Sequence, residues 1–198
     1  MATNIEIEAK VLISQQDYLK VKDYFKDRVA DEYTQHNYYI DTPDFDLRTH
    51  GAGLRIREVK NKRVITLKTP IAEGLLEKTE EISENQYNDM IKNGIIPETK
   101  IKTFLIMLGY DISKLNILAS LSTDRIDVKV PEYTFSIDKN TYADTVDYEL
   151  EREANNALQA QNDLISICEE CKIAYTINKE SKASRAMKYV YNNKKKVA

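Results

Sequence analysis

The stretch NIEIEAKVL, residues 4–12, alternates apolar and charged side chains without interruption from position 5 to position 11. Glu6, Glu8 and Lys10 occupy the even-numbered positions, and apolar residues occupy the odd-numbered ones. A period of two predicts a β-strand with one apolar face and one charged face. The charged side chains then form a row about 13 Å long, at roughly 3.3 Å per residue. Whether this row faces solvent or lines an interior depends on the rest of the chain.

The composition of the 198-residue chain is that of one globular domain, residues 1–198, with enough apolar residues for a buried core. A net charge of -3 argues against a dedicated nucleic-acid-binding protein, although a pocket in an acidic protein can be basic. The first residues lack the apolar segment of a signal peptide, and no apolar run is long enough to span a bilayer. We therefore expect a cytoplasmic protein with no nucleic-acid and no membrane partner.

The two cysteines and two histidines offer little for metal or nucleophilic chemistry. Cys168 and Cys171 form one CxxC within a helical pattern, with no second pair to complete a zinc site. We interpret them as structural residues, and whether they ever react stays open. His36 and His50 are too few for a metal cage built on histidine.

Segments with strand-like alternation recur along the chain, and helical patterns separate several of them. We expect eight strands, at residues 4–13, 33–41, 53–59, 62–69, 74–82, 117–130, 133–138 and 145–153. Helices are predicted to begin at Ser14, to run from Ser83 to Gly94, to end at Gly109, and to cover 154–171 and 180–192. The segment DTPDFDLRTHGAG, residues 41–53, is typical of a loop. This order of elements predicts an α+β domain built on an antiparallel sheet.

The charged face of the first strand has counterparts on other strands. Arg55 and Arg57 alternate with apolar residues in LRIR, and the glutamates of YELERE also share one face. Amphipathic helices between the strands need apolar surfaces on which to pack, and the apolar strand faces provide them. The charged faces must then point inward. The pattern therefore predicts a barrel with a charged bore and an apolar outer wall clad in helices.

A bore of this kind holds two sets of ionisable residues, and buried charges need partners. The carboxylates are Glu6, Glu8, Glu77, Glu149 and Glu151, and the cations are Lys10, Arg55, Arg57, Lys68 and Arg125. Clustered carboxylates without His or Cys suit hard cations such as Mg²⁺ or Mn²⁺. Clustered arginine and lysine suit phosphate oxygens. Together they predict a site for a polyphosphate bridged by metal.

The chain also resembles a known family. Residues 6–10, EIEAK, match the ExExK signature of CYTH proteins, which are also called triphosphate tunnel metalloenzymes. Residues 38–58 resemble the second family signature, an Asp-Thr-Pro loop that leads into Leu-Arg-x-Arg, and TLKTP, GLLEKTEEIS and DYELERE follow in the expected order. The resemblance extends from residue 4 to about residue 190. It is strongest to the small stand-alone CYTH proteins of Firmicute-type bacteria.

The resemblance implies a closed eight-stranded antiparallel barrel, a tunnel that binds a triphosphate lengthwise. It implies that the metal is bound by Glu6, Glu8, Glu77, Asp138, Glu149 and Glu151. It also implies that phosphate is bound by Lys10, Arg55, Arg57, Lys68 and Arg125. The final helix, 180–192, would close or plug the tunnel and project Lys182 or Arg185 toward the substrate. Lys10 joins the four glutamates Glu6, Glu8, Glu149 and Glu151 as a candidate catalytic residue. Thr79 and Thr123 stand where some relatives carry a second glutamate and a second basic residue.

The predicted function is hydrolysis of the terminal phosphate of a triphosphate, inorganic or organic, with Mg²⁺ or Mn²⁺. Three alternatives stay open. The first is an adenylyl cyclase of the class IV type, which turns ATP into cyclic AMP and pyrophosphate in the same kind of tunnel. The second is a thiamine triphosphatase, and the third is a polyphosphate- or nucleotide-binding module without catalysis. The physiological substrate, the metal, and a monomeric or homodimeric state are not decided by the sequence.

Overall fold

A computed structural model describes residues 1–197, with side chains up to Asn192, and within this range the chain forms one nine-stranded antiparallel sheet and six α-helices. The strands are β1 (Ala2–Glu6), β2 (Glu8–Ile13), β3 (Val29–Asp41), β4 (Gly53–Val59), β5 (Lys62–Pro70), β6 (Leu75–Glu81), β7 (Asn116–Lys129), β8 (Thr134–Tyr142) and β9 (Thr145–Glu153). The helices are α1 (Gln15–Tyr24), α2 (Asp46–Thr49), α3 (Glu84–Asn93), α4 (Lys100–Met107), α5 (Ala157–Glu170) and α6 (Lys182–Val197), with 3₁₀ turns η1 (Lys26–Arg28) and η2 (Ile112–Lys114).

The sheet curls into a half-barrel with the strand order β1-β6-β5-β4-β3-β7-β8-β9-β2. Its two edge strands, β1 and β2, are consecutive in sequence and meet at Ile7. β1 pairs with β6, whereas β2 pairs with β9. The predicted α+β fold, with an antiparallel sheet curled around a charged interior and clad by helices, is confirmed. The resemblance implies eight strands in a closed barrel, whereas the structure has nine strands in a half-barrel, and the additional strand arises because the stretch 4–13 divides at Ile7.

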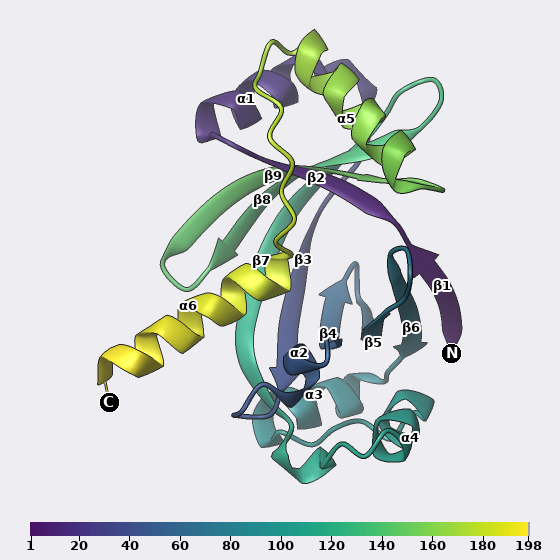
Figure 1. Cartoon of the computed structure of the whole chain (residues 1–198), viewed down its shortest axis with the longest axis vertical. Coiled ribbons are helices and arrows are strands. Elements are labelled where there is room, and N and C mark those ends of the chain that lie inside the picture. The colour runs from purple at the N-terminus through teal and green to yellow at the C-terminus, as the bar shows by residue number, and fades with distance from the viewer. Residues whose placement is uncertain (198) are drawn as a thin grey trace.

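Helices cover the convex face of the sheet, as Figure 1 shows. α1 and α5 pack at one end, over apolar residues of β2, β8 and β9 such as Val11, Ile137 and Leu150. α3 and α4 pack at the other end, over apolar residues of β4 and β5 such as Ile56 and Ile65. On the concave face, α6 packs against an apolar cluster that includes Tyr39, Ala119 and Leu121, and charged residues line much of the remainder. This inside-out arrangement is the one that the alternation of the strands predicts.

The capping signals in the sequence mark the helix termini correctly. The Ser14 side chain accepts a hydrogen bond from the Asp17 N–H, 3.1 Å away, at the start of α1. Ser83 and Gln86 form a capping box at the start of α3, and Gly94 ends that helix with a φ of 68°. Such caps satisfy backbone groups that have no partner within the helix.

The segment 41–53 is not a plain loop, because it contains the short helix α2. The buried Asp41 carboxylate accepts N–H groups of Thr42, Leu47 and Arg48 at 2.8, 2.9 and 3.1 Å. A carboxylate at the start of a helical turn compensates the exposed N–H groups there. Asp41 thus folds the segment back on itself and sets the start of β4, which carries Arg55 and Arg57.

Cys168 lies in α5 and Cys171 at its C-terminal end, and both side chains are buried in the core, as a structural role requires. Both are free thiols, with 1% exposure for Cys168 and 8% for Cys171. Burial raises the pKa of each thiol to about 11, which disfavours the reactive thiolate. Within residues 1–197, no helix combines the length and the apolar character needed to cross a membrane.

Gly74, in the turn between β5 and β6, allows the two edge strands to meet. Its φ is +85°, and a Cβ there would lie 2.4 Å from the Glu6 carbonyl oxygen and 2.9 Å from Ile7 Cγ1. Any side chain at position 74 would push β1 away from β6 at Glu6. The turn therefore depends on glycine for space as well as for backbone conformation.

We expect Gly74→Ala to destabilise the protein more than Gly109→Ala, measured as the free energy of unfolding in urea. Gly109 has the same backbone conformation, φ +86°, but open space around it. Gly109→Ala should therefore cost about 1–2 kcal/mol from conformation alone, and Gly74→Ala about 1–3 kcal/mol more from overpacking. Gly53→Ala, with an ordinary φ and nothing within 4 Å, is the control. Equal losses for Gly74→Ala and Gly109→Ala would contradict the role of the contact with Glu6.

Candidate functional site

The concave face of the sheet encloses a cavity of about 910 Å³. The predicted site residues that line it are Glu6, Glu8, Lys10, Arg55, Arg57, Lys68, Glu77, Arg125, Glu151 and Lys182. The other three, Asp138, Glu149 and Arg185, are buried in contact with Lys182 or with one another. The structure thus brings all the sequence-predicted residues to one region, although it does not by itself assign their roles.

One carboxylate cluster consists of Asp138 on β8 and Glu149 and Glu151 on β9, and is called here the carboxylate triad. One oxygen of each lies within 4.8 Å of the others. Asp138 and Glu149 are cross-strand partners, and both are fully buried. The alternation of β9 places residues 149 and 151 on the same face, while Leu150 packs outward under the helices.

Three cations surround the carboxylate triad. The Lys182 ammonium, at the start of α6, lies 2.8 Å from Asp138 Oδ2 and 2.5 Å from Glu151 Oε1, and it also pairs with Glu149. Arg125 Nε and Nη2 donate to the two oxygens of Asp138 at 2.8 and 2.6 Å, and Nη2 also donates to Glu151. Arg185 Nη2 donates to Glu149 at 2.7 Å. The triad is therefore compensated within the protein.

The electrostatics of the triad are unequal between its two glutamates. Burial and the charge of Glu151 raise the pKa of Glu149 to about 7, against the opposing effect of Lys182 and Arg185. Burial also acts to raise the pKa of Glu151, but Lys182, Arg125 and Lys10 hold it well below the usual range. Burial tends to lower the pKa of Lys182, yet the three carboxylates raise it. The Lys182 ammonium is thus charged and firmly held.

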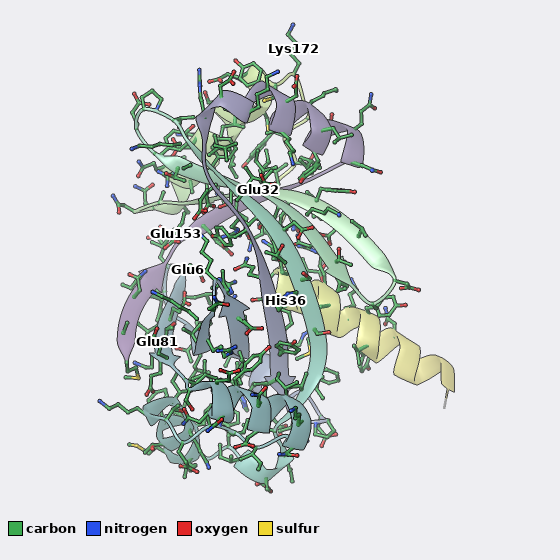
Figure 2. The ribbon with its side chains drawn as sticks, turned by 180° about the vertical axis from the view of Figure 1, so that it is seen from behind. Glu6, Glu32, His36, Glu81, Glu153 and Lys172 are labelled. Atoms are coloured by element: carbon green, nitrogen blue, oxygen red, sulfur yellow. The ribbon has the colours of Figure 1, made fainter. Side chains whose placement is uncertain are left out.

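A second carboxylate cluster lies where β1 and β2 meet and consists of Glu6, Glu8, Glu77 and Glu153. Lys68 pairs with Glu6, and Lys10 pairs with Glu8. Figure 2 shows Glu6 and Glu153 close together at this level. Among the side chains up to residue 192, none forms a salt bridge or a hydrogen bond with the Glu153 carboxylate, although the Glu153 backbone carbonyl accepts from Arg152. Burial, then Glu6, Glu77 and Glu8, raise its pKa.

Two arginines of β4 form the basic wall of the cavity. Arg57 Nε donates to the Asn37 side-chain oxygen at 2.8 Å, and Arg55 Nη2 lies 3.8 Å from Glu77 Oε1. Burial, followed by the positive charges of Arg55 and Arg125, lowers the pKa of Arg57 to about 9. Arg55 Nε is buried and has no hydrogen-bond partner among the described residues. This wall is therefore prepared for an anion.

Several residues that sequence reasoning did not assign to the site also reach it. Glu153 continues the alternation of Glu149 and Glu151, a signal that was available in the sequence. Arg48 of α2 lines the cavity, and its guanidinium donates to the Ser184 hydroxyl of α6 at 3.0 Å. Asn37 contacts Arg57 across the β3–β4 register, and Asp147 of β9 contacts Arg185 of α6, and both contacts depend on the folded arrangement.

The carboxylate triad has a donor set that fits a divalent cation. Its oxygens converge within 4.8 Å and belong to the hard ligands that Mg²⁺ and Mn²⁺ prefer. The Lys182 ammonium lies among the same three carboxylates. A metal ion at the triad and the ammonium in its present position would therefore compete for the same oxygens.

Comparisons with known proteins identify the family of the chain. The family model of the CYTH domain matches residues 4–187. The Bacillus subtilis protein named "Putative triphosphatase YjbK" is 33% identical over 154 residues, which are 78% of this chain and 80% of that protein. A crystal structure described as "a putative adenylate cyclase (bh2851)" from Bacillus halodurans has a TM-score of 0.85 and 29% identity, covering 93% of this chain and 98% of that one.

A third relative shows the fold alone, because its sequence identity is 24%. It is the Hippeastrum protein HpAC1, whose structure is described as revealing "a dominant triphophatase activity". Its TM-score is 0.77, over 90% of this chain and 93% of that chain. Proteins similar to this chain thus carry both triphosphatase and cyclase names.

Lys182→Ala should destabilise the metal-free protein, because it removes the cation that contacts all three triad carboxylates. Removing one partner of a buried ion pair costs about 3–5 kcal/mol. Mg²⁺ should then raise the thermal unfolding midpoint of Lys182→Ala more than that of the wild type, since the ion replaces the lost charge. The measurement is calorimetry in chelator and in Mg²⁺.

Lys188→Ala on the same helix is the matched control. Lys188 is 61% exposed, and its ammonium lies 3.9 Å from Glu180. Exposed pairs of this kind contribute little to stability. The interpretation of the triad as a cation site fails if Mg²⁺ shifts the midpoints of Lys182→Ala and the wild type equally.

Proposed function

Because the chain belongs to the CYTH family, we propose that it is a divalent-metal-dependent triphosphatase that hydrolyses the terminal phosphate of a triphosphate held in the charged cavity. The observation that carries this proposal is the arrangement of one cavity. Arg55 and Arg57 form a basic wall, and two separate carboxylate clusters lie on the strands around it. A polyanion together with a divalent cation satisfies both sets of charges at once.

Binding of the phosphates is assigned to the cations that line the cavity. Arg57 forms no salt bridge among the described side chains, and Arg55 has one carboxylate, Glu77, at 3.8 Å and an Nε without a partner, so both guanidinium groups have nitrogens that can donate to phosphoryl oxygens. Lys68 and Lys10 already pair with Glu6 and Glu8, so they lie where phosphate and metal-binding residues meet. Their charges would stabilise the additional negative charge that develops as the terminal phosphoryl group is transferred to water.

The carboxylates would hold Mg²⁺ or Mn²⁺, with Glu6, Glu8 and Glu77 at one cluster and the triad at the other. When bound, such an ion polarises phosphoryl oxygens and lowers the pKa of a bound water. Neither histidine lines the cavity. Proton transfer would therefore fall to carboxylates such as that of Glu153, which has no partner among the described side chains.

We also infer that α6 closes the cavity on one side. Ser181, Lys182, Ser184 and Met187 line it, and Met187 packs against a buried cluster that includes Tyr39. In Figure 1, α6 lies across β7 and β3, and its C-terminal end extends away from the sheet. When a metal ion binds the triad carboxylates, the Lys182 ammonium would leave them and pair with a phosphate oxygen instead.

The lining of the cavity favours a triphosphatase over a cyclase or a thiamine triphosphatase. The aromatic residues among its described lining are Tyr39 and Phe135, which are 5% and 1% exposed. A cyclase must hold an adenine and aim its ribose, and stacking on an aromatic ring is the usual way to hold a base. A buried ring cannot stack on a base. Inorganic tripolyphosphate needs no such platform.

A binding module without catalysis is the other alternative. Binding of a polyphosphate requires the basic wall alone, whereas two carboxylate clusters oppose an anion unless cations accompany it. The presence of both carboxylate clusters beside the basic wall therefore supports catalysis over binding alone.

The deciding experiment incubates the purified protein with Mg²⁺ or Mn²⁺ and, separately, tripolyphosphate, ATP or thiamine triphosphate. Fastest phosphate release from tripolyphosphate is the expected result. Cyclic AMP with pyrophosphate from ATP would assign the protein to the cyclases. Metal-dependent binding without turnover of any of the three would support the binding module.

Glu8→Gln should reduce tripolyphosphate turnover at least about 100-fold. Loss of a residue that only hydrogen-bonds to a metal ligand already lowers activity about 10- to 100-fold, and Glu8 is proposed as a ligand itself. Glu149→Gln should behave in the same way. The measurement is phosphate release at saturating Mg²⁺, with circular dichroism to check folding. Glu98→Gln, at a side chain that is 83% exposed, is the control and should retain full activity. Near-normal turnover in both Glu8→Gln and Glu149→Gln would refute the metal assignment.

A further inference from the structure

The arginines that line the cavity differ in what compensates their charge. Arg125 donates to Asp138 through two nitrogens and also contacts Glu151. Arg55 has Glu77 at 3.8 Å. Arg57, by contrast, forms no salt bridge with any side chain in the described range, and its one hydrogen bond goes to the neutral amide of Asn37.

The pairs Arg57–Asn37 and Arg125–Asp138 have the same geometry, since in each pair the two residues lie directly opposite one another on neighbouring strands. Arg57 on β4 lies directly opposite Asn37 on β3. Arg125 on β7 likewise lies directly opposite Asp138 on β8. In each pair the arginine Nε donates to a side-chain oxygen at 2.8 Å. The same contact is thus made once by an amide and once by a carboxylate of similar shape, and only the carboxylate neutralises its arginine.

Asn37 is itself fixed from both sides. It is 1% exposed, and its side-chain nitrogen points to the Leu121 carbonyl oxygen on β7 at 3.5 Å. This contact leaves the side-chain oxygen facing Arg57. The amide therefore connects β4 to β7 and fixes the direction of the Arg57 guanidinium while it adds no charge.

We propose that Asn37 is a positioning residue that orients Arg57 in the cavity without neutralising it, so that the charge of Arg57 stays available for a phosphate oxygen of the substrate. This inference rests on the proposed function and deepens it. It assigns different tasks to the two arginines. Arg57 binds phosphate, and Arg125 chiefly compensates the carboxylate triad.

The surroundings of Arg57 support this division. Burial, Arg55 and Arg125 all disfavour its charged form, and burial is the largest of these effects. Tyr39 and Glu151 offset that cost only in part, since the pKa of Arg57 remains lowered, and the position directly opposite Arg57 holds an amide instead of a carboxylate. The cost is relieved instead when an anion binds, and an arrangement of this kind favours tight binding of phosphate.

The test is Asn37→Asp, which changes the charge and hardly changes the shape. With Mg²⁺ and tripolyphosphate, Asn37→Asp should raise KM about 10- to 100-fold, the range expected for a lost hydrogen bond between charged groups. The value of kcat should change far less. Thermal unfolding monitors the fold, because the new carboxylate also faces the Leu121 carbonyl oxygen.

Asn116→Asp is the matched control for the substitution itself. Asn116 is exposed on β7 outside the cavity lining, and its side chain contacts the Lys114 carbonyl oxygen. It should leave KM unchanged. If Asn37→Asp fails to fold, Asn37→Ser removes the oxygen that orients Arg57 without adding charge, and it should raise KM severalfold.

A double-mutant cycle separates positioning from a general structural effect. In an Arg57→Gln background, Asn37→Asp or Asn37→Ser should change KM less than about twofold, since no guanidinium remains to be oriented or neutralised. An unchanged KM in both Asn37 variants, or an equal rise in KM with and without Arg57, would overturn the inference while the triphosphatase stands. A wild-type protein that neither binds nor hydrolyses tripolyphosphate would overturn both.

Discussion

The structure depends on one constraint, which is that charged side chains turned inward must find their partners inside the protein. The helices take the apolar face of each strand, so the opposite faces meet around a cavity. At the carboxylate triad the compensation is supplied by Lys182, Arg125 and Arg185. Where β1 meets β2, two lysines face four glutamates. The residues that would bind a ligand are therefore also the residues that stabilise the fold without it.

The division of charge across the cavity follows from the strand order. β1, β2, β6, β8 and β9 carry the carboxylates of the two clusters, and β4 carries the two arginines of the basic wall. Glu6 and Glu8 reach the same cavity although they pair with different strands, because the break at Ile7 preserves their alternation. The Ile7 carbonyl oxygen accepts the Ala154 N–H at 2.9 Å, which ties the break to the end of β9. Divided pairing thus brings the carboxylates of four strands, β1, β2, β6 and β9, to one cluster.

The faces of the strands were predictable because period-two alternation survives any change in strand pairing. Arg55, Arg57, Glu149 and Glu151 lie inside for this reason. The break at Ile7 was not predictable from residues 4–13, which contain neither Gly nor Pro. A contact remote in sequence lies beside it, since Gly74, in the turn between β5 and β6, closely approaches Glu6 and Ile7. Helix α2 was missed because its organising contact is the Asp41 carboxylate, which a count of loop-forming residues does not register.

The candidate site shows the same limit. A carboxylate or an arginine on a strand face is conspicuous in a sequence, whereas a buried amide such as Asn37 acquires meaning only from the residue opposite it. In the final helix, Lys182 and Arg185 are three residues apart and both reach the carboxylates, so a choice between them was unnecessary. Charge patterning identifies the charged residues of the site, whereas strand register and helical spacing determine which of them are in contact.

The pairing of β2 has a consequence for the order in which the molecule assembles. Glu8 lies opposite Glu153, so one of the first strands of the chain takes its partner from far along the sequence. Closing so long a loop is entropically costly, and pairing between distant strands slows folding. Local hairpins such as β4–β5 and β8–β9 need no such closure. The cavity can be completed only when β9 is present, and a chain that stops before β9 would leave β2 without its partner strand and Glu8 without the residue opposite it.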